Sequence, residues 1–362
     1  MRNLVRSRTH PGRRLLNSSA FCRWRFGILF LVLSLAAGGC RTDPVAPQQN
    51  LQRFSWESAE MGTLFTITLY ATNSAVAHDA ARAAFVRVAD LEQEMSDYRA
   101  DSELNLLCEK PIGQPVPISA DLLDIFEKAQ RISKLSDGAF DVTVGPYVRL
   151  WRFSRKRKTL PDTAELAQAR AAVGWRNLRL DARHHTATLL VPNMRLDLGG
   201  IAKGYAADEA LRVLNRFGIR RAMVAASGDF AIGDSPPDQS GWKIGITAID
   251  ERNNRIERAV VLHNCGISTS GDTEQAIEIG GVRYSHIVDP ATGLGLTNRI
   301  QASVLAPNAT LTDALATALC VLGPERSERL ISKLPKTGAI ILTKEGENNR
   351  EFNLGHVPEF QR

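Results

Sequence analysis

The order of helix-like and strand-like segments is the sequence feature that most constrains the fold of this chain. Apolar residues recur at helical spacing in four early segments, at 74–95, 119–138, 162–174 and 205–218. Alternating apolar and polar residues then predict later strands at 242–249, 258–263, 275–279 and 282–288. Because strands and helices segregate more than they alternate, we predict an α+β fold rather than a doubly wound parallel sheet.

Single residues mark where several of these helices begin and end. Ser119 is an N-cap candidate for the second helix, and Gly138 stops it. Asp162 or Thr163 caps the third helix, and Gly174 closes it. Since no linker-like stretch divides residues 51–350, we expect one domain.

The first 39 residues have the layout of a secretory leader and are set aside from the fold. They contain seven arginines and no acidic residue, with an apolar run from Phe26. Cys40 follows Ala37-Gly38-Gly39, which resembles a bacterial lipobox with Ala37 where such motifs usually have Leu. We therefore expect a lipid anchor on Cys40, a tether over 40–52, and a protein on the periplasmic side of a bacterial membrane, inner or outer.

The net charge of the mature chain argues against a nucleic-acid partner. The full sequence has 45 basic and 39 acidic residues. Without the seven leader arginines, 38 basic residues face 39 acidic ones, so the net charge is −1. We interpret the short run RKRK at 155–158 as a solvated loop, with partner or phospholipid contact as the alternative. The sequence therefore predicts no nucleic-acid partner.

The stretch LDLGGIAKGY at 196–205 joins a strand end to a helix through a glycine pair. Gly199 and Gly200 permit close backbone approach and positive φ, which suits a backbone that faces a phosphate or a metal. Asp197 and Lys203 add a carboxylate and an ammonium. Because neither the P-loop pattern nor the dinucleotide-binding glycine pattern is present, the turn is either a structural connection or part of a different binding site.

The segment 269–293 contains a histidine in an unusual setting. Gly280-Gly281 predicts a hairpin turn, and the return strand places Tyr284, His286 and Val288 on one face. Such a histidine is either a hydrogen-bonded structural residue or a catalyst. The neighbouring Ser/Thr/Gly-rich turns make the two interpretations equally good.

The segment 306–320 offers two oxygen ligands on one helical face. Asp313 and Thr317 are four residues apart, and such hard ligands suit Mg²⁺ or Ca²⁺ better than zinc. The alternative is that Asp313, Thr310 or Thr312 caps the helix. Capping does not explain Thr317, which lies one turn inside.

Two further polar segments lie far away in the sequence. Asp141 is in GAFDVTVGP, and Tyr98 follows a helix end in MSDYRADSELNLL, where Ser102 is a cap candidate. Each residue has a plausible structural role by itself. Together with the glycine turn and the histidine segment, they are consistent with one long polar cleft of nucleotide size.

These segments, in this order, resemble the FAD:protein FMN transferases of the ApbE family. The resemblance covers roughly residues 55–345, and it is specific as a combination although each motif alone is weak. It implies a single compact ApbE-like domain with a mixed or antiparallel sheet core flanked by helices. The matching motifs are MGTLFTITLY, MSDYRADSELNLLC, GAFDVTVGP, LDLGGIAKGYAAD, SGDFAIG, ISTSGDTE, YSHIVDPATG and TDALATALCVLG.

The resemblance implies a Mg²⁺-dependent enzyme with FAD as its substrate. In the family, a Thr or Ser hydroxyl of a target protein attacks the FMN-side phosphorus, giving a phosphoester-linked flavin and releasing AMP. The implied acceptors are proteins of respiratory or electron-transfer complexes, with the acceptor Thr following Ser-Gly-Ala. Two alternatives stay open: an FAD pyrophosphatase that forms FMN and AMP, and a flavin-binding lipoprotein without turnover.

The family's motifs also imply roles for individual residues. The implied metal ligands are the side chains of Asp313 and Thr317 and the backbone carbonyl of Gly200. His286 and Asp313 are the implied catalytic residues, and either His286 or an Asp near the metal is the proton acceptor. The implied nucleotide contacts are Met61, Tyr98, Ala139, Phe140, Asp141, Asp197, Lys203 and His286.

The predicted boundaries follow from the leader and the extent of the resemblance. Residues 1–39 are the lipoprotein signal peptide, and 40–52 are the tether after Cys40. Residues 53–350 are the transferase domain, and 351–362 are a C-terminal tail.

Overall fold

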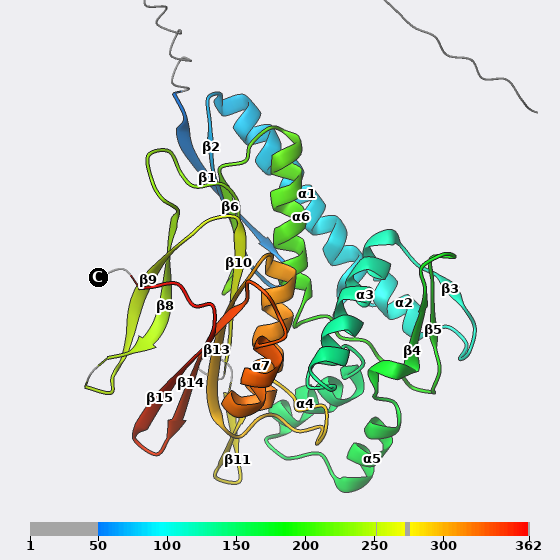
Figure 1. The fold of residues 1–362 in the computed structure, drawn as a ribbon. Coiled ribbons are helices and arrows are strands. Elements are labelled where there is room, and N and C mark those ends of the chain that lie inside the picture. The colour runs from blue at the N-terminus through cyan, green and yellow to red at the C-terminus, as the bar shows by residue number, and fades with distance from the viewer. Residues whose placement is uncertain (1–49, 251, 272–275, 361–362) are drawn as a thin grey trace, which may run out of the picture. The chain divides into compact units, whose positions relative to one another are not determined.

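Eight strands form one antiparallel sheet through the molecule (Figure 1). The computed structural model describes residues 50–250, 252–271 and 276–360. Each neighbouring pair in the sheet is antiparallel, which confirms the predicted α+β class. In spatial order the strands are β1 (Gln52–Glu60), β2 (Thr63–Ala71), β6 (Ala222–Ala226), β7 (Asp229–Ile232), β10 (Cys265–Gly271), β13 (Arg299–Ala306), β14 (Gly338–Glu345) and β15 (Asn348–Gly355).

Three helices cover one face of this sheet: α1 (Ser74–Met95), α6 (Ala202–Arg216) and α7 (Ala309–Ile331) (Figure 1). Alanine is the most frequent residue at their buried positions, so the helices pack closely on one another and on the strands. On β13, Ile300 and Val304 face this helical layer and are fully buried or nearly so. The main core therefore lies between the sheet and the three helices.

A long hairpin covers the other face of the sheet. It consists of β8 (Trp242–Ile249) and β9 (Arg255–Leu262), which pair along their whole length. Trp242 and Ile246 of the hairpin form a second buried cluster with Ile340 and Leu342 of β14. Because successive strand residues point to opposite faces, β13 and β14 contribute to both cores.

A second group of elements lies beside α6 and α7. The hairpin of β11 (Ala276–Ile279) and β12 (Val282–Ser285) docks there on α4, where the rings of Tyr284 and Trp151 are 5.4 Å apart. The other elements of this group are α2 (Glu103–Cys108), α3 (Ala120–Leu135), α4 (Gly145–Arg157), α5 (Thr163–Ala171), the 3₁₀ turn η1 (Trp175–Asn177) and a small sheet of β3 (Val116–Pro117), β5 (Thr186–Leu189) and β4 (Leu178–Asp181).

Several predicted helix ends and turns are confirmed. Ser102 and Ser119 cap α2 and α3, each accepting a backbone N–H with its hydroxyl oxygen. Of the two candidates at α5, Asp162 is the cap and forms a reciprocal capping box with Glu165. Gly280 and Gly281 both have positive φ in the β11–β12 turn, as a two-residue hairpin requires.

Two local predictions are wrong, and the capping alternative at α7 is excluded. The last strand of the hairpin ends at Ser285 and does not reach 288. The run at 155–158 is not a loop, because its first three residues form the last turn of α4. The cap of α7 is Asn308, whose side chain accepts the N–H of Leu311.

The predicted tail from residue 351 is wrong for residues 351–355. These residues belong to β15, which pairs with β14 and closes the sheet, so the folded unit extends to Gly355. At the other end, β1 begins at Gln52, the last residue of the predicted tether. The predicted leader and Cys40 lie outside the described residues. Within the described ranges, every helix is too short or too polar to cross a membrane.

Candidate functional site

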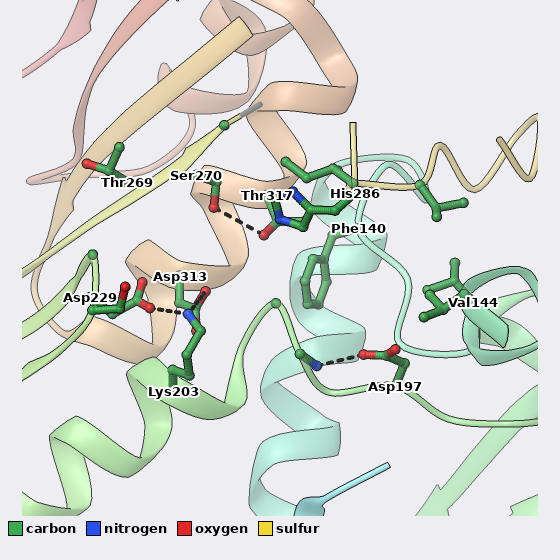
Figure 2. A pocket seen from close by; sticks show the side chains of 18 of the residues that line it. Phe140, Val144, Asp197, Lys203, Asp229, Thr269, Ser270, His286, Asp313 and Thr317 are labelled. Carbon is green, nitrogen blue, oxygen red and sulfur yellow. Dashed lines mark hydrogen bonds and ion pairs between the residues drawn. The ribbon is translucent and has the colours of Figure 1, made fainter. Parts of the chain in front are cut away.

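The sequence-predicted site residues meet in one cavity of about 750 Å³ (Figure 2). The bend before α6, the first turns of α7, the segment after β12 and the loop before α4 form its walls. Met61 does not line this cavity. It lies in the β1–β2 turn, where its N–H donates to Glu92. The predicted residues that do line it are Tyr98, Ala139, Phe140, Asp141, Asp197, Gly200, Lys203, His286, Asp313 and Thr317.

Two glycines allow the bend at 197–204 to pack against α7. A Cβ on Gly200 would lie 3.0 Å from Thr317 Oγ1, so a side chain at this position would crowd that hydroxyl. A Cβ on Gly204 would lie 2.2 Å from the carbonyl oxygen of Ala309, which forbids any side chain there. The glycines thus bring the start of α6 next to the helix that carries Asp313.

Asp313 is held by α6 and does not cap its own helix. Its carboxylate is almost completely buried and accepts the backbone N–H of Gly204 at 3.0 Å. The Nζ of Lys203 lies 3.8 Å from the other carboxylate oxygen and forms a close ion pair with Asp229 (Figure 2). The two buried carboxylates therefore share a single ammonium.

This arrangement leaves excess negative charge in the cavity. Burial and the neighbouring carboxylate of Asp229 raise the pKa of Asp313 to about 7, against the opposing effect of Lys203. The pKa of Lys203 is also raised, because the attraction of Asp313 and Asp229 outweighs its burial. A cation bound here would relieve the repulsion between the carboxylates.

The donor set beside Asp313 fits a hard cation. Thr317 Oγ1 is 3.5 Å from Ser270 Oγ and lies against the backbone of Gly200. Carboxylate, hydroxyl and backbone oxygens are the ligands that Mg²⁺ accepts. Over the described part of the chain, no group of three His, Cys, Asp or Glu side chains is placed to hold a metal ion, so a metal here needs hydroxyl and backbone oxygens as well.

An arginine and a second acid, both unpredicted, surround Asp197. Arg152 of α4 contacts Asp97 at 2.6 Å and Asp197 at 3.7 Å, and its guanidinium lies 4.0 Å from the centre of the Tyr98 ring. Asp197 also accepts the N–H of Gly199 at 2.8 Å. Burial and the charge of Asp97 raise the pKa of Asp197 to about 6. Tyr98 is highly exposed at the rim of the cavity.

Asp141 lines the cavity but uses both carboxylate oxygens to fix the local backbone. One oxygen accepts the N–H and the hydroxyl of Thr143, each at 2.7 Å. The other accepts the N–H of Trp175 at 2.8 Å. Burial raises the pKa of Asp141 despite these bonds. Its clearest role in the structure is to hold the loop that presents Ala139 and Phe140.

His286 lies in the cavity wall, on a different side of the chain from its predicted neighbours. Tyr284 and Val288 are buried against α4, whereas His286 is exposed to the cavity. The prediction that His286 shares a face with Tyr284 and Val288 is wrong, because the chain turns after β12. In this turn the Ser285 hydroxyl accepts the N–H of Ile287. The Ser285 carbonyl also accepts the indole N–H of Trp151, which fixes this turn.

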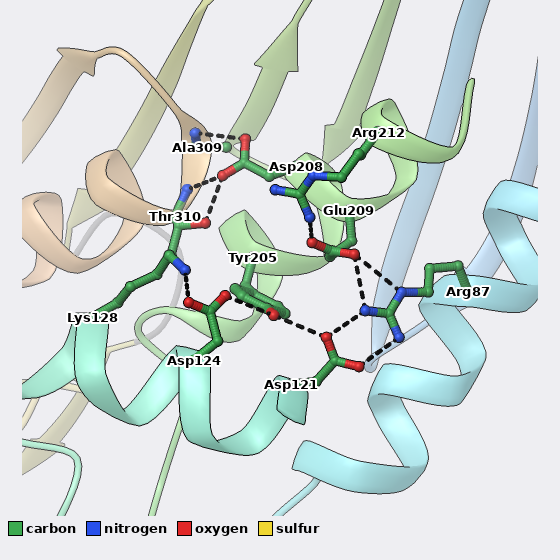
Figure 3. Close-up of polar contacts among 10 residues, drawn as sticks. All are labelled: Arg87, Asp121, Asp124, Lys128, Tyr205, Asp208, Glu209, Arg212, Ala309 and Thr310. Carbon is green, nitrogen blue, oxygen red and sulfur yellow. Dashed lines mark hydrogen bonds and ion pairs between the residues drawn. The ribbon is translucent and has the colours of Figure 1, made fainter. Parts of the chain in front are cut away.

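A polar network behind the cavity ties its helices together (Figure 3). Asp208 of α6 accepts the N–H groups of Ala309 and Thr310 at 2.9 and 2.8 Å, and the Thr310 hydroxyl at 2.5 Å. Asp208 therefore caps α7 from a neighbouring helix. Arg87 of α1 bridges Asp121 of α3 and Glu209 of α6, which fixes the other side of α6.

Sequence reasoning missed five residues of this region: Asp97, Arg152, Asp208, Asp229 and Ser270. Four of them lie inside motifs that were recognised, so their polar character was a usable signal: Asp97 in MSDYRADSELNLLC, Asp208 in LDLGGIAKGYAAD, Asp229 in SGDFAIG and Ser270 in ISTSGDTE. Arg152 and Asp97 meet only through the packing of α4 against the loop after α1, which local sequence does not reveal.

Comparison with solved structures identifies the class of protein. The fold is similar to that of the flavin transferase ApbE from Vibrio cholerae, with a TM-score of 0.76 and 28% identity over 84% of this chain and 97% of that one. It is also similar to the flavinyl transferase ApbE from Pseudomonas stutzeri in its apo form, with a TM-score of 0.75 and 27% identity. That match covers 84% of this chain and 95% of the other. Both are flavin transferases by name.

Comparison of sequences gives the family. The ApbE family profile matches residues 61–341, so the chain belongs to the ApbE family, and the predicted resemblance is confirmed. Among curated relatives, the FAD:protein FMN transferase of Salmonella typhimurium is 30% identical over 352 residues, which cover 94% of this chain and 97% of the relative. The FAD:protein FMN transferase of Klebsiella pneumoniae is 29% identical, and the match covers 93% of this chain and 96% of the relative.

Proposed function

We propose that this protein is an FAD:protein FMN transferase that links FMN through a phosphoester to a Thr or Ser hydroxyl of an acceptor protein and releases AMP. Membership of the family and the names of its relatives support the transferase activity. The single structural observation that carries the proposal is the convergence of Asp313, Thr317 and the glycine bend in one cavity of nucleotide size.

The chemistry requires neutralisation of the pyrophosphate charge more than covalent help from the protein. Mg²⁺ held by Asp313, Thr317 and the backbone at Gly200 would polarise the phosphoryl oxygens. Lys203 supplies a fixed positive charge in the same wall, held in place by Asp229. Arg152 supplies a second cation in the cavity lining, next to the exposed ring of Tyr98.

The acceptor hydroxyl must lose a proton as its oxygen bonds to phosphorus. His286 is the better proton acceptor in this proposal, because it faces the cavity while Asp313 is engaged by Gly204 and Lys203. The proton then resides on the imidazole, and the AMP phosphate leaves with the electron pair of the broken phosphoanhydride bond. Asp313 is better suited to the cation than to proton transfer.

Location and partners complete the proposal. The leader pattern and Cys40 support a lipid-anchored protein on the periplasmic side of a membrane. Acceptors there are flavin-carrying proteins of respiratory or electron-transfer complexes.

Product analysis tests this function against its alternatives. Purified protein is incubated with FAD, Mg²⁺ and a peptide containing Ser-Gly-Ala-Thr, and the products are identified by mass spectrometry. An FMN adduct on Thr supports transfer. Free FMN and AMP with unmodified peptide identify a hydrolase, and unchanged FAD identifies a binder.

The metal assignment is tested in the same assay. Asp313→Ala should abolish adduct formation at every Mg²⁺ concentration, whereas Asp181→Ala, at an exposed strand end, should leave it unchanged. Full activity of Asp313→Ala would overturn the assignment.

A further inference from the structure

Another cavity, of about 450 Å³, is lined by residues of the β8–β9 and β14–β15 turns and of the start of β13. These two turns lie toward the lower left of Figure 1. Four cationic side chains line it: Arg255, Arg283, Arg299 and Lys344. Among the described residues, Glu347 is the acidic one in its lining. It is almost fully exposed and lies 3.5 Å from Lys344. We call this cavity the arginine cavity.

The positive charges of the arginine cavity repel one another. Arg299 and Lys344 are directly paired across β13 and β14, so two cations occupy neighbouring positions. Burial and the charge of Arg299 lower the pKa of Arg255, and the same two causes lower that of Arg283. Like charges gathered in a concave site form a strong attraction for an anion.

Two polar atoms of this cavity are buried without a hydrogen-bond partner among the described residues. They are Nε of Arg255, a donor, and Oδ1 of Asn349, an acceptor. The hydrogen bonding of these two side chains is therefore incomplete within the described part of the chain. The guanidinium groups of the lining are hydrogen-bond donors, so a ligand here must offer acceptors.

The walls of the cavity are held in place without a ligand. Asn349 N donates to Asn253 Oδ1 at 2.8 Å, and Asn349 Nδ2 donates to the Asn253 carbonyl at 2.7 Å, which joins the two turns. Glu351 accepts the N–H of Ile249 at 2.8 Å and fixes the hairpin to β15. A preorganised site loses little conformational entropy on binding.

The arginine cavity and the cavity of about 750 Å³ described above, here called the active cavity, lie along the same strands. Gln301 lines the active cavity, and Arg299 is two residues before it on β13, so both side chains point to the same face, about 7 Å apart along the strand. On the hairpin, Thr247 lines the active cavity, and Arg255 pairs with Ile249, two residues further on. A chain extending out of the active cavity along β13 would reach the arginines.

We infer that the arginine cavity binds an acidic segment of the acceptor polypeptide, next to the residue that receives FMN. This inference rests on the proposed function, since that reaction requires a polypeptide in the active cavity. Carboxylates of such a segment accept hydrogen bonds from the guanidinium groups of Arg255 and Arg299.

Peptide binding tests the inference without any transfer step. Two labelled peptides share the core Ser-Gly-Ala-Ala, in which Ala replaces the acceptor Thr, and carry either four flanking Asp or four flanking Asn residues. Fluorescence anisotropy at low salt should give a Kd at least tenfold lower for the Asp peptide, and 0.5 M NaCl should reduce this preference. Because no flavin moves, the result stands whether or not transfer occurs.

Variants show which residues cause the preference for the Asp peptide. The double variant Arg255→Gln/Arg299→Gln should lose the preference, and Arg255→Lys, which keeps the charge but not Nε, should keep part of it. The matched control Arg82→Gln/Arg216→Gln removes two exposed cations from α1 and α6 and should keep it fully. Thermal melting and FAD binding establish that each variant is folded.

Three results would overturn the inference. The first is equal Kd values for the two peptides. The second is an unchanged preference in the Arg255/Arg299 double variant. The third is binding to phosphatidylglycerol vesicles that is lost in the Arg255/Arg299 double variant, together with no preference between the peptides. This result would assign the arginine cavity to a lipid headgroup.

Discussion

The carboxyl group of Asp197 should make the stability of this protein fall as the pH rises. Burial and the charge of Asp97 raise its pKa from the ordinary 3.8 to about 6 in the folded state. Its side chain is 12% exposed, so solvent screens these effects little. At 1.36 kcal/mol per pKa unit, the difference corresponds to about 3 kcal/mol.

The sign follows from proton linkage. A raised pKa in the folded state means that the folded protein holds its proton longer than the unfolded chain does. The associated stability is fully present below pH 3.8 and is lost as the pH rises through about 6. Asp197→Asn keeps an acceptor for the N–H of Gly199 but cannot ionise, so the variant escapes this loss.

Urea unfolding at a series of pH values measures the effect. The free energy of unfolding of Asp197→Asn minus that of the wild type should increase by about 2 kcal/mol between pH 4 and pH 7, because part of the total of about 3 kcal/mol falls outside this pH window. Asp234→Asn is the control of opposite sign, because the hydrogen bond from Arg220 lowers the pKa of Asp234. A difference curve for Asp197→Asn that is flat, or that falls with pH, would refute the reasoning.

Three further substitutions test the scaffold of the site. Asp208→Ala removes the acceptor of two N–H groups and one hydroxyl at the start of α7 and should lower the free energy of unfolding by about 3 kcal/mol. Asp208→Asn should restore about half of this loss. Equal stability of the wild type and both variants in urea would contradict this role. Gly204→Ala places a Cβ 2.2 Å from the Ala309 carbonyl and should cost at least about 2 kcal/mol and weaken Mg²⁺ activation, as melting and transfer assays would show. Asp162→Ala removes an exposed capping box and should cost about 1 kcal/mol in urea while leaving transfer unchanged, so a loss of transfer would count against a purely local role.

Features set by a few adjacent residues were predictable from the sequence. The caps at Ser119 and Asp162 and the Gly280-Gly281 turn depend on side chains and φ preferences within four residues. The α+β class followed from the segregation of strand and helix patterns. The family resemblance supplied the set of remote motifs, and ten of its eleven named site residues line one cavity.

Features set by long-range packing were not predictable in the same way. Asp313 looked equally like a cap and a ligand, and only the approach of Gly204 shows that α6 holds it while Asn308 caps α7. Residues 351–355 were predicted to belong to a C-terminal tail, but they form part of β15. Their pairing with β14 overrides a weak local strand signal. Arg255 and Arg299 meet only after the strands have assembled.

The central claim is that Thr317 and Asp313 hold the cation that neutralises the FAD pyrophosphate. The rate of FMN adduct formation as a function of Mg²⁺ concentration, measured for the wild type and for Thr317→Val, tests it most directly. Valine keeps the shape of threonine and removes one oxygen ligand next to Gly200. The Mg²⁺ concentration for half-maximal rate should rise at least tenfold in the variant, and saturating Mg²⁺ should restore part of the rate. An unchanged Mg²⁺ dependence would contradict the claim.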